Sequence, residues 1–194
     1  MKKISELFFK YRSYTPIPFL ILMVIFQEAT ISSLIAGFVV VCIGEFFRLW
    51  GVSYAGSETR TTGGGVGGTY LVVTGAFSHV RNPLYFGNMT IYIGIGLMSL
   101  AWYPYLMLIA GIFFFIQYTF IIREEENYLH EKFGELYEEY KAAVPRWIPT
   151  LTKYKKVGSE QPTYDIKKGL RSERRTLQAI SITTLLLVIL YLVA

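Results

Sequence analysis

Polar residues that can bind a ligand gather at the start of a long apolar run. An arginine offers a planar fork of N–H donors that suits a carboxylate, and neighbouring amides and a phenol add neutral hydrogen-bonding groups. From spacing alone, this run fits a ligand site and a capped helix end equally well, because proline is common at a helix start. The residues concerned are His79, Arg81, Asn82, Pro83, Tyr85 and Asn88.

Two further groups of ionisable residues lie beside apolar runs. Arg123 is followed by three glutamates, at positions 124–126, and adjacent carboxylates can accept hydrogen bonds from a ribose diol or an ammonium group. A solvated acidic turn is the simpler interpretation of that group. Glu45 and Arg48 are three residues apart, on one face of an expected helix. The two residues lie near the end of an expected membrane helix. Ionisable residues within a membrane helix pair with one another or face a cavity, so this pair is a candidate site.

The sequence predicts neither a metal site nor a nucleotide-binding loop. His79 and His130 are the two histidines, and neither has a carboxylate at a metal-binding offset in its helix. Cys42 is the single cysteine and reads as a small apolar residue. The glycine-rich run at 63–68 satisfies G-x-G-x-x-G through its composition alone, so we interpret it as a flexible loop.

The composition is that of an integral membrane protein. Of the 194 residues, 53% are hydrophobic and 17% are charged, which is more apolar than a typical soluble domain. A membrane-spanning helix needs roughly 20 apolar residues. We therefore predict an all-α polytopic bundle of about five transmembrane helices and a cytoplasmic amphipathic helix. The five predicted spans are 14–26, 31–47, 84–101, 105–122 and 176–194.

The amphipathic helix is predicted from a pattern that follows residue 123. Apolar residues recur there at three- and four-residue spacing as far as Tyr140, and Pro145 and Pro149 end the pattern. Residues 153–169 are expected to form a loop. We divide the single membrane domain into an N-terminal hairpin with the glycine-rich loop at 1–70, a catalytic core at 71–150, and a loop with the last span at 151–194.

The distribution of positive charge predicts the orientation. With five spans, all 19 Lys and Arg residues fall on one side, including the basic cluster at 167–175. The positive-inside rule then places the N-terminus in the cytoplasm and the C-terminus on the opposite side. The net charge of +5 is therefore interpreted as a topology signal and not as a nucleic-acid surface, and no ligand site is predicted in the basic cluster.

The polar groups stand in an order that resembles a known family. Residues 74–85 read TGAFSHVRNPLY, residues 123–126 read REEE, and residues 145–149 read PRWIP. A predicted helical hairpin separates the first two motifs. The combination resembles the integral-membrane methyltransferases that include isoprenylcysteine carboxyl methyltransferase and the phospholipid N-methyltransferases. The resemblance covers about residues 71–149.

The resemblance implies a helical bundle that binds S-adenosylmethionine in a pocket facing the cytoplasm, without a Rossmann domain. Arg81, Pro83 and Tyr85 match the family's Arg-His/Asn-Pro-x-Tyr motif, and Glu124 and Glu125 match its glutamate pair. Arg146 matches the arginine before the terminal Ile-Pro, near the cofactor or the acceptor headgroup. The cofactor-binding set implied in this way is His79, Arg81, Asn82, Pro83, Tyr85, Asn88, Glu124 and Glu125.

Two classes of acceptor fit the transfer of a methyl group from S-adenosylmethionine. Arg48 or Arg146 could orient a carboxylate, whose charge is neutralised as it attacks the sulfonium methyl group in a dry pocket. Glu45 could instead accept the proton of an amine. Asn82 stands where carboxyl methyltransferases carry a histidine, which leaves the class open. In either case the expected acceptor is a lipid, a prenylated molecule or another small amphiphile.

Two alternative functions are weighed against methyl transfer. Membrane reductases of the sterol type share an Arg-x-Pro-x-Tyr-like stretch but use NADPH, and the glutamate pair favours the methyltransferase over them. A non-catalytic scaffold or small transporter is the other alternative. Transporters usually carry polar groups near the bilayer midplane, whereas this chain gathers them at one interface.

Overall fold

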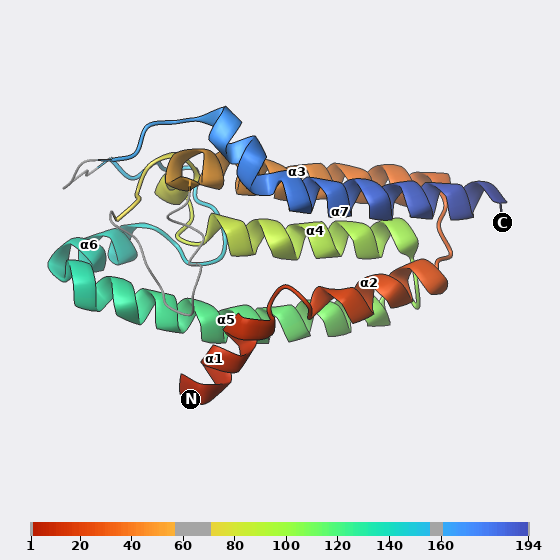
Figure 1. Cartoon of the computed structure of the whole chain (residues 1–194), viewed down its shortest axis with the longest axis horizontal. Helices are drawn as coiled ribbons and strands as arrows, with labels where there is room; N and C mark the ends of the chain where they lie inside the picture. Colours follow the sequence, from red (N-terminus) through yellow and green to blue (C-terminus); the bar gives the residue numbers. More distant parts are fainter. Residues whose placement is uncertain (1, 57–70, 156–160, 194) are drawn as a thin grey trace.

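The computed structural model describes residues 2–56, 71–155 and 161–193, and every regular element in these ranges is helical (Figure 1). The glycine-rich run at 63–68 lies outside the described residues. The elements are α1 (Lys2–Tyr11), α2 (Pro16–Ile25), α3 (Ile31–Ala55), the short 3₁₀ helix η2 (Gly75–Ser78), α4 (Pro83–Ser99), α5 (Tyr105–Phe133), α6 (Glu135–Ala143) and α7 (Ile166–Val193).

Five helices, α2 to α5 and α7, run along the long axis of the molecule (Figure 1). Three of them, α3, α5 and α7, are long and apolar enough to cross a membrane. The other two are shorter, because α4 has 17 residues and α2 has 10. The α2–α3 and α4–α5 connections and the C-terminal end lie together at one end of the bundle, opposite α6 (Figure 1).

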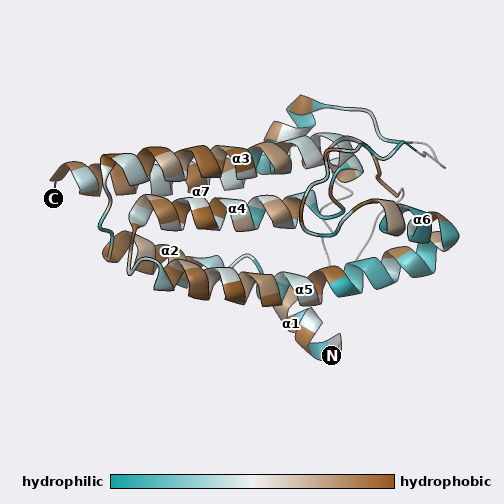
Figure 2. Ribbon diagram, turned by 180° about the vertical axis from the view of Figure 1, so that it is seen from behind, coloured by the Kyte–Doolittle hydropathy of each residue, from teal (hydrophilic) through white to brown (hydrophobic). Residues whose placement is uncertain are grey.

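The polarity of the side chains differs between the two ends of the molecule. The long helices are mostly hydrophobic, whereas α6 and the last turns of α5 are hydrophilic (Figure 2). Many large apolar side chains on the long helices are exposed, including Ile35, Ile112 and Leu185. A soluble protein would bury such side chains, so this surface suits a lipid environment.

Helix boundaries differ from the predicted ones at four places. α3 continues to Ala55, eight residues beyond its predicted end. α7 begins at Ile166 and not at 176, because Asp165 caps it by accepting a hydrogen bond from the Lys168 amide at 3.0 Å. The predicted helix after 123 continues α5, but it breaks at Gly134, whose φ of 51° ends α5 before α6 begins. The N-terminal residues preceding the first predicted span form a separate helix, α1.

α3 and α4 approach each other more closely than ordinary side chains permit. A Cβ atom added to Gly37 would lie 2.5 Å from the Gly94 carbonyl oxygen, and one added to Gly44 would lie 2.7 Å from that of Gly87. These glycines recur every seven residues on both helices, which keeps them on one face. The two backbones therefore meet along a glycine seam, and the residues beside it are held at fixed positions.

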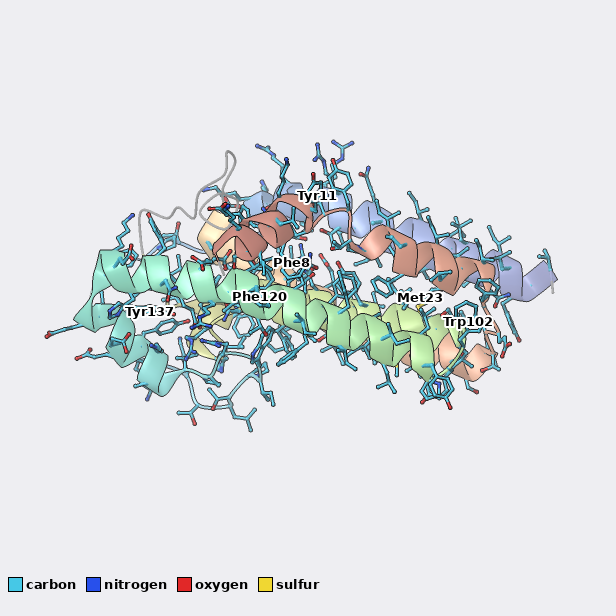
Figure 3. All side chains as sticks on the ribbon, turned by 90° about the horizontal axis from the view of Figure 1, so that it is seen from below. Phe8, Tyr11, Met23, Trp102, Phe120 and Tyr137 are labelled. Carbon is cyan, nitrogen blue, oxygen red and sulfur yellow. The ribbon has the colours of Figure 1, made fainter. Side chains whose placement is uncertain are left out.

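The N-terminal helix α1 packs across α5. Ser5 Oγ donates a hydrogen bond to the Phe120 carbonyl at 2.6 Å, and the Phe8 ring lies 5.8 Å from that of Phe120 (Figure 3). Thr15 Oγ1, in the turn before α2, donates to Gln117 Oε1 at 3.0 Å. These contacts attach the first residues of the chain to the middle of α5.

Candidate active site

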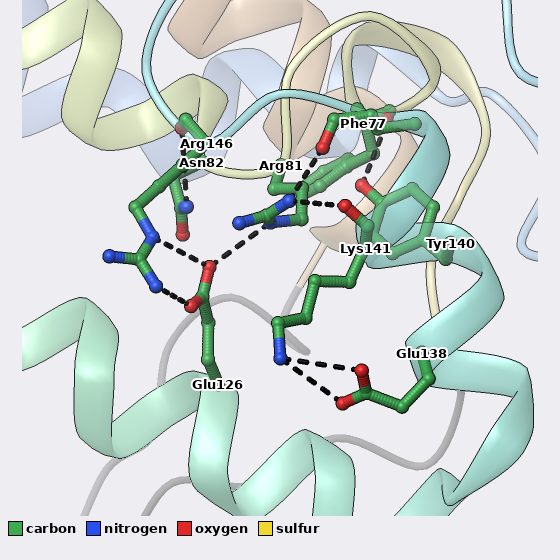
Figure 4. Close-up of polar contacts among 9 residues, drawn as sticks. Phe77, Arg81, Asn82, Glu126, Glu138, Tyr140, Lys141 and Arg146 are labelled. Carbon is green, nitrogen blue, oxygen red and sulfur yellow. Dashed lines mark hydrogen bonds and ion pairs between the residues drawn. The ribbon is translucent and has the colours of Figure 1, made fainter.

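The first polar cluster centres on a glutamate held between two arginines (Figure 4). Arg81 Nε donates to Glu126 Oε1 at 3.0 Å, and Arg146 Nε donates to the same oxygen at 3.1 Å. A second Arg146 nitrogen, Nη2, contacts Glu126 Oε2. The Arg81 and Glu126 side chains are only 10% and 8% exposed. We call Arg81, Glu126 and Arg146 the outer cluster.

Two backbone carbonyls accept further hydrogen bonds from Arg81 and fix the position of its side chain. Its Nη1 donates to the carbonyls of Lys141 and Val144 at 2.7 and 2.6 Å, which lie at the end of α6 and just beyond it. Tyr140 donates from its hydroxyl to the Phe77 carbonyl at 2.7 Å, and burial raises the pKa of this hydroxyl, so it stays a donor. The motif before α4 and the segment after α6 are thereby joined, although more than sixty residues separate them in sequence.

The motif residues around Arg81 have separate contacts. Tyr85 donates to Glu125 Oε1 at 2.8 Å, which links α4 to α5 beside the outer cluster. Asn82 Nδ2 donates to the Arg146 carbonyl at 3.4 Å, and Pro83 is the buried first residue of α4. His79 Nδ1 lies 2.8 Å from the Thr150 carbonyl oxygen. Glu124 is half-buried.

The second polar cluster lies deeper in the bundle, where α3, α4 and α7 meet. Arg48 Nε and Nη2 donate to Glu173 Oε2 at 3.2 and 2.5 Å, and Nη2 also donates to Thr176 Oγ1 at 3.2 Å. Arg48 Nη1 contacts Asn88 Oδ1. Glu45 lies 3.7 Å from Arg48 Nε. We call these residues the inner cluster.

Glu45 is the member of the inner cluster with spare acceptors. Glu45 is 9% exposed, and neither of its carboxylate oxygens has a hydrogen-bond partner among the described residues. A buried carboxylate without donors is costly, because its desolvation is not repaid. An unsatisfied group of this kind is therefore a candidate contact for a ligand.

The glycine seam positions Arg48. A Cβ atom on Gly87 would lie 2.5 Å from Arg48 Cγ, so the aliphatic part of the arginine passes directly over the α4 backbone. Asn88 is the next residue of α4, and its amide contacts the guanidinium. The structure thus assigns Asn88 to the inner cluster and not to the group around Arg81.

Two acidic members of these clusters are absent from the predicted site. Glu126 extends a stripe of buried α5 residues at four-residue spacing, which includes Phe114, Tyr118 and Ile122, so helical periodicity distinguishes it from its neighbours. Glu173 is the single acid in the basic stretch 166–175, and it is 1% exposed. A lone acid in a basic helix end is a usable signal, but its partner lies 125 residues away.

No group of three or more His, Cys, Asp or Glu side chains that could hold a metal ion is found among the residues that the structure describes. The side chains of the two clusters instead suit a zwitterionic organic ligand. Arginines can hold a carboxylate, and glutamates can accept hydrogen bonds from hydroxyl or ammonium groups.

Comparison with known proteins defines the class of this protein. A model of the phospholipid methyltransferase family matches residues 32–136, which extend from α3 through both motifs to the start of α6. The chain belongs to this family, which is part of the superfamily of membrane methyltransferases that also includes isoprenylcysteine carboxyl methyltransferase.

Two curated relatives are similar over a large part of the chain. The nickel-cobalt-cadmium resistance protein NccN of Alcaligenes xylosoxydans xylosoxydans is 30% identical over 136 residues, which cover 70% of this chain and 57% of the relative. The cobalt-zinc-cadmium resistance protein CzcN of Cupriavidus metallidurans is 30% identical over 121 residues, covering 61% and 50%. The chain thus spans about half the length of these relatives. No solved structure matches.

Proposed function

We propose that this protein transfers a methyl group from S-adenosylmethionine to a lipid-like acceptor at the cytoplasmic face of a membrane. The observation that carries the proposal is the outer cluster, in which two arginines from separate family motifs converge on Glu126. The family match favours this reaction over the NADPH-dependent reductase and the scaffold. S-adenosylmethionine supplies an activated methyl group on a sulfonium sulfur, so the protein mainly has to orient the partners and exclude water.

The described residues fit this cofactor. The outer cluster carries one positive charge in excess, which suits the cofactor's carboxylate. Glu125 and the half-buried Glu124 offer carboxylate oxygens for hydroxyl groups of a ribose or for an ammonium group, and Tyr85 orients Glu125 from α4. His79, Asn82 and Pro83 hold the backbone turn from which Arg81 projects.

The inner cluster favours an amine acceptor. Arg48 is engaged by Glu173, Thr176 and Asn88, so it has little capacity left to orient a carboxylate. When Glu45 is ionised, the cluster carries one negative charge in excess. In a site of low dielectric constant such an excess attracts a cationic headgroup, and Glu45 is placed to accept a proton from it.

We further propose that α3, α4, α5 and α7 span the bilayer, that α2 together with the residues flanking it makes a fifth crossing, and that the N-terminus lies in the cytoplasm. α4 is 17 residues long, and lies beside α3 along the glycine seam. The connections at the end opposite α6, residues 26–30 and 100–104, carry no Lys or Arg. This arrangement agrees with the positive-inside rule.

Ligand binding to the detergent-purified full chain tests the proposal. We expect saturable binding of S-adenosylmethionine, measured by calorimetry, and no binding of NADPH. Arg81→Ala and Glu125→Ala should each abolish S-adenosylmethionine binding. Glu131→Ala, which removes an exposed carboxylate from the helix that carries Glu125, should leave it unchanged. NADPH binding, or equal binding by all variants, would contradict the proposal. Transfer of labelled methyl groups to extracted membrane lipids would then identify the acceptor.

A further inference from the structure

An open groove lies along the outer side of α7. It has a volume of about 780 Å³ and is wide open to its surroundings. All of its lining residues belong to α7, where they recur at helical spacing over about three turns. The lining consists of Leu170, Arg171, Arg174, Leu177, Gln178, Ser181 and Ile182. This helix lies beyond residues 32–136, so the family match does not account for the groove.

The groove is basic at one end and more apolar at the other. Arg171 and Arg174 are exposed and lie one helical turn apart, so both guanidinium groups can reach a single phosphate. Toward the C-terminus the lining continues with Leu177 and then Ile182, which is 59% exposed. An amphiphile fits this arrangement, with its anionic headgroup at the basic end and its hydrocarbon chain along the apolar end.

The positive charge at the groove is not neutralised by the described part of the chain. Neither Arg171 nor Arg174 forms an ion pair with a described residue, and the single acid of this stretch, Glu173, points to the other side of α7 and binds Arg48. A phosphate beside the bilayer would supply the missing charge. The apolar window of α7 is only 17% buried within the chain, which leaves the helix open to lipid.

We propose that this groove binds one anionic phospholipid, with its phosphate between Arg171 and Arg174 and an acyl chain along Leu177 and Ile182. The basic cluster at 167–175 then has a ligand in addition to its part in topology. The lipid is bound on the face of α7 away from the inner cluster, so this proposal is independent of methyl transfer.

Native mass spectrometry of the detergent-purified chain tests this binding. The protein is titrated with phosphatidylglycerol or with phosphatidylcholine of the same acyl chains. We expect one phosphatidylglycerol molecule to bind about tenfold more tightly than phosphatidylcholine, from the attraction of two arginines near a membrane surface. The double variant Arg171→Gln/Arg174→Gln should lose this preference.

A matched control distinguishes a specific lipid site from non-specific electrostatic attraction between anionic lipid and the basic helix end. Lys168→Gln/Arg175→Gln removes the same charge from exposed positions of α7 outside the groove lining, and it should keep the preference. Ser181→Trp fills the groove without a change of charge and should weaken binding. Equal loss in both double variants, or unchanged binding in Ser181→Trp, would overturn the proposal. Displacement of the lipid by soluble glycerol phosphate would do so too, because it would indicate a site for free anions.

Discussion

The outer and inner clusters use the same residue types in opposite arrangements. In the outer cluster one glutamate, Glu126, lies between two arginines, and in the inner cluster one arginine, Arg48, lies between two glutamates. The first has an excess positive charge at the end of the bundle, and the second has an excess negative charge in its interior. Under the proposed function, the outer cluster would bind the cofactor's carboxylate and the inner cluster the acceptor's ammonium group before its deprotonation.

The largest expected effect comes from the glycine seam that holds the inner cluster. Gly44→Leu places side-chain atoms against the Gly87 carbonyl, so α3 and α4 must separate. We expect a loss of about 3 kcal/mol or more of stability, as for severe overpacking. Thermal unfolding in detergent measures it. Gly111→Leu on α5 is the control, because nothing lies within 4 Å of its added Cβ, and an equal loss there would contradict the role of the seam.

A smaller effect is expected from the pair at the centre of the inner cluster. Glu173→Gln removes the carboxylate that binds Arg48 most closely and leaves Glu45, 3.7 Å away, as its charged neighbour, so it should cost about 2 kcal/mol, as for lost hydrogen bonds to a charged group. The triple variant Glu45→Met/Arg48→Met/Glu173→Met replaces all three charges by apolar side chains and should regain most of this stability. Thermal unfolding of the single and triple variants measures the difference. If the triple variant is no more stable than Glu173→Gln, the buried charges are not the cause.

The outer cluster should respond in ligand binding more than in stability. Glu126→Gln removes the anion between Arg81 and Arg146. The Arg146 side chain is one-third exposed and can turn to solvent, and Arg81 keeps its hydrogen bonds to two backbone carbonyls. We expect S-adenosylmethionine affinity to fall about tenfold or more, as for loss of a charged hydrogen bond, with little change in unfolding temperature. Calorimetry on Glu126→Gln and Glu173→Gln gives the comparison. The same loss of affinity in both would remove the distinction between the clusters.

Tyr85→Phe probes the edge of the outer cluster. It deletes the hydroxyl that donates to Glu125 and keeps the ring, which lies 4.8 Å from that of Tyr118. Loss of one such hydrogen bond should weaken S-adenosylmethionine binding by about fivefold. Glu125→Ala already lacks the acceptor, so adding Tyr85→Phe to it should cause no further fall in the thermal unfolding temperature. A further fall in the double variant would show that the Tyr85 hydroxyl has a second partner.

The smallest effect is expected at His79. Its ring contacts the Thr150 carbonyl and lies 5.5 Å from the Trp50 ring, which indicates a structural position at the end of the bundle. His79→Gln keeps a hydrogen-bonding side chain and should change S-adenosylmethionine affinity less than twofold, because the Thr150 contact can be replaced. Titration calorimetry decides this, and a loss as large as that of Arg81→Ala would place His79 in the binding site.

Prediction from the sequence succeeds where a property repeats along the chain. Apolar runs gave helices near the predicted segments. The motif containing Arg81 and Tyr85 lies beside α5, and its role in cofactor binding stays a prediction. Boundaries were less accurate, since α7 begins ten residues before the predicted span at its Asp165 cap. The contacts of Glu126 were missed because the prediction took the first two of three adjacent glutamates, and only one side of a helix faces its neighbour.

Composition and hydrophobic runs determined by themselves that this is a helical membrane protein, since they reflect local physical properties, whereas the order of the motifs gave only a resemblance to the membrane methyltransferases. Only the tertiary structure decided which charges meet. Glu173 joins Arg48 because the glycine seam brings α3 and α4 together and α7 packs on α3, where Gly169 lies against Ser53. Such pairing depends on helix rotation and distance in space, and neither is encoded in any single segment of the chain.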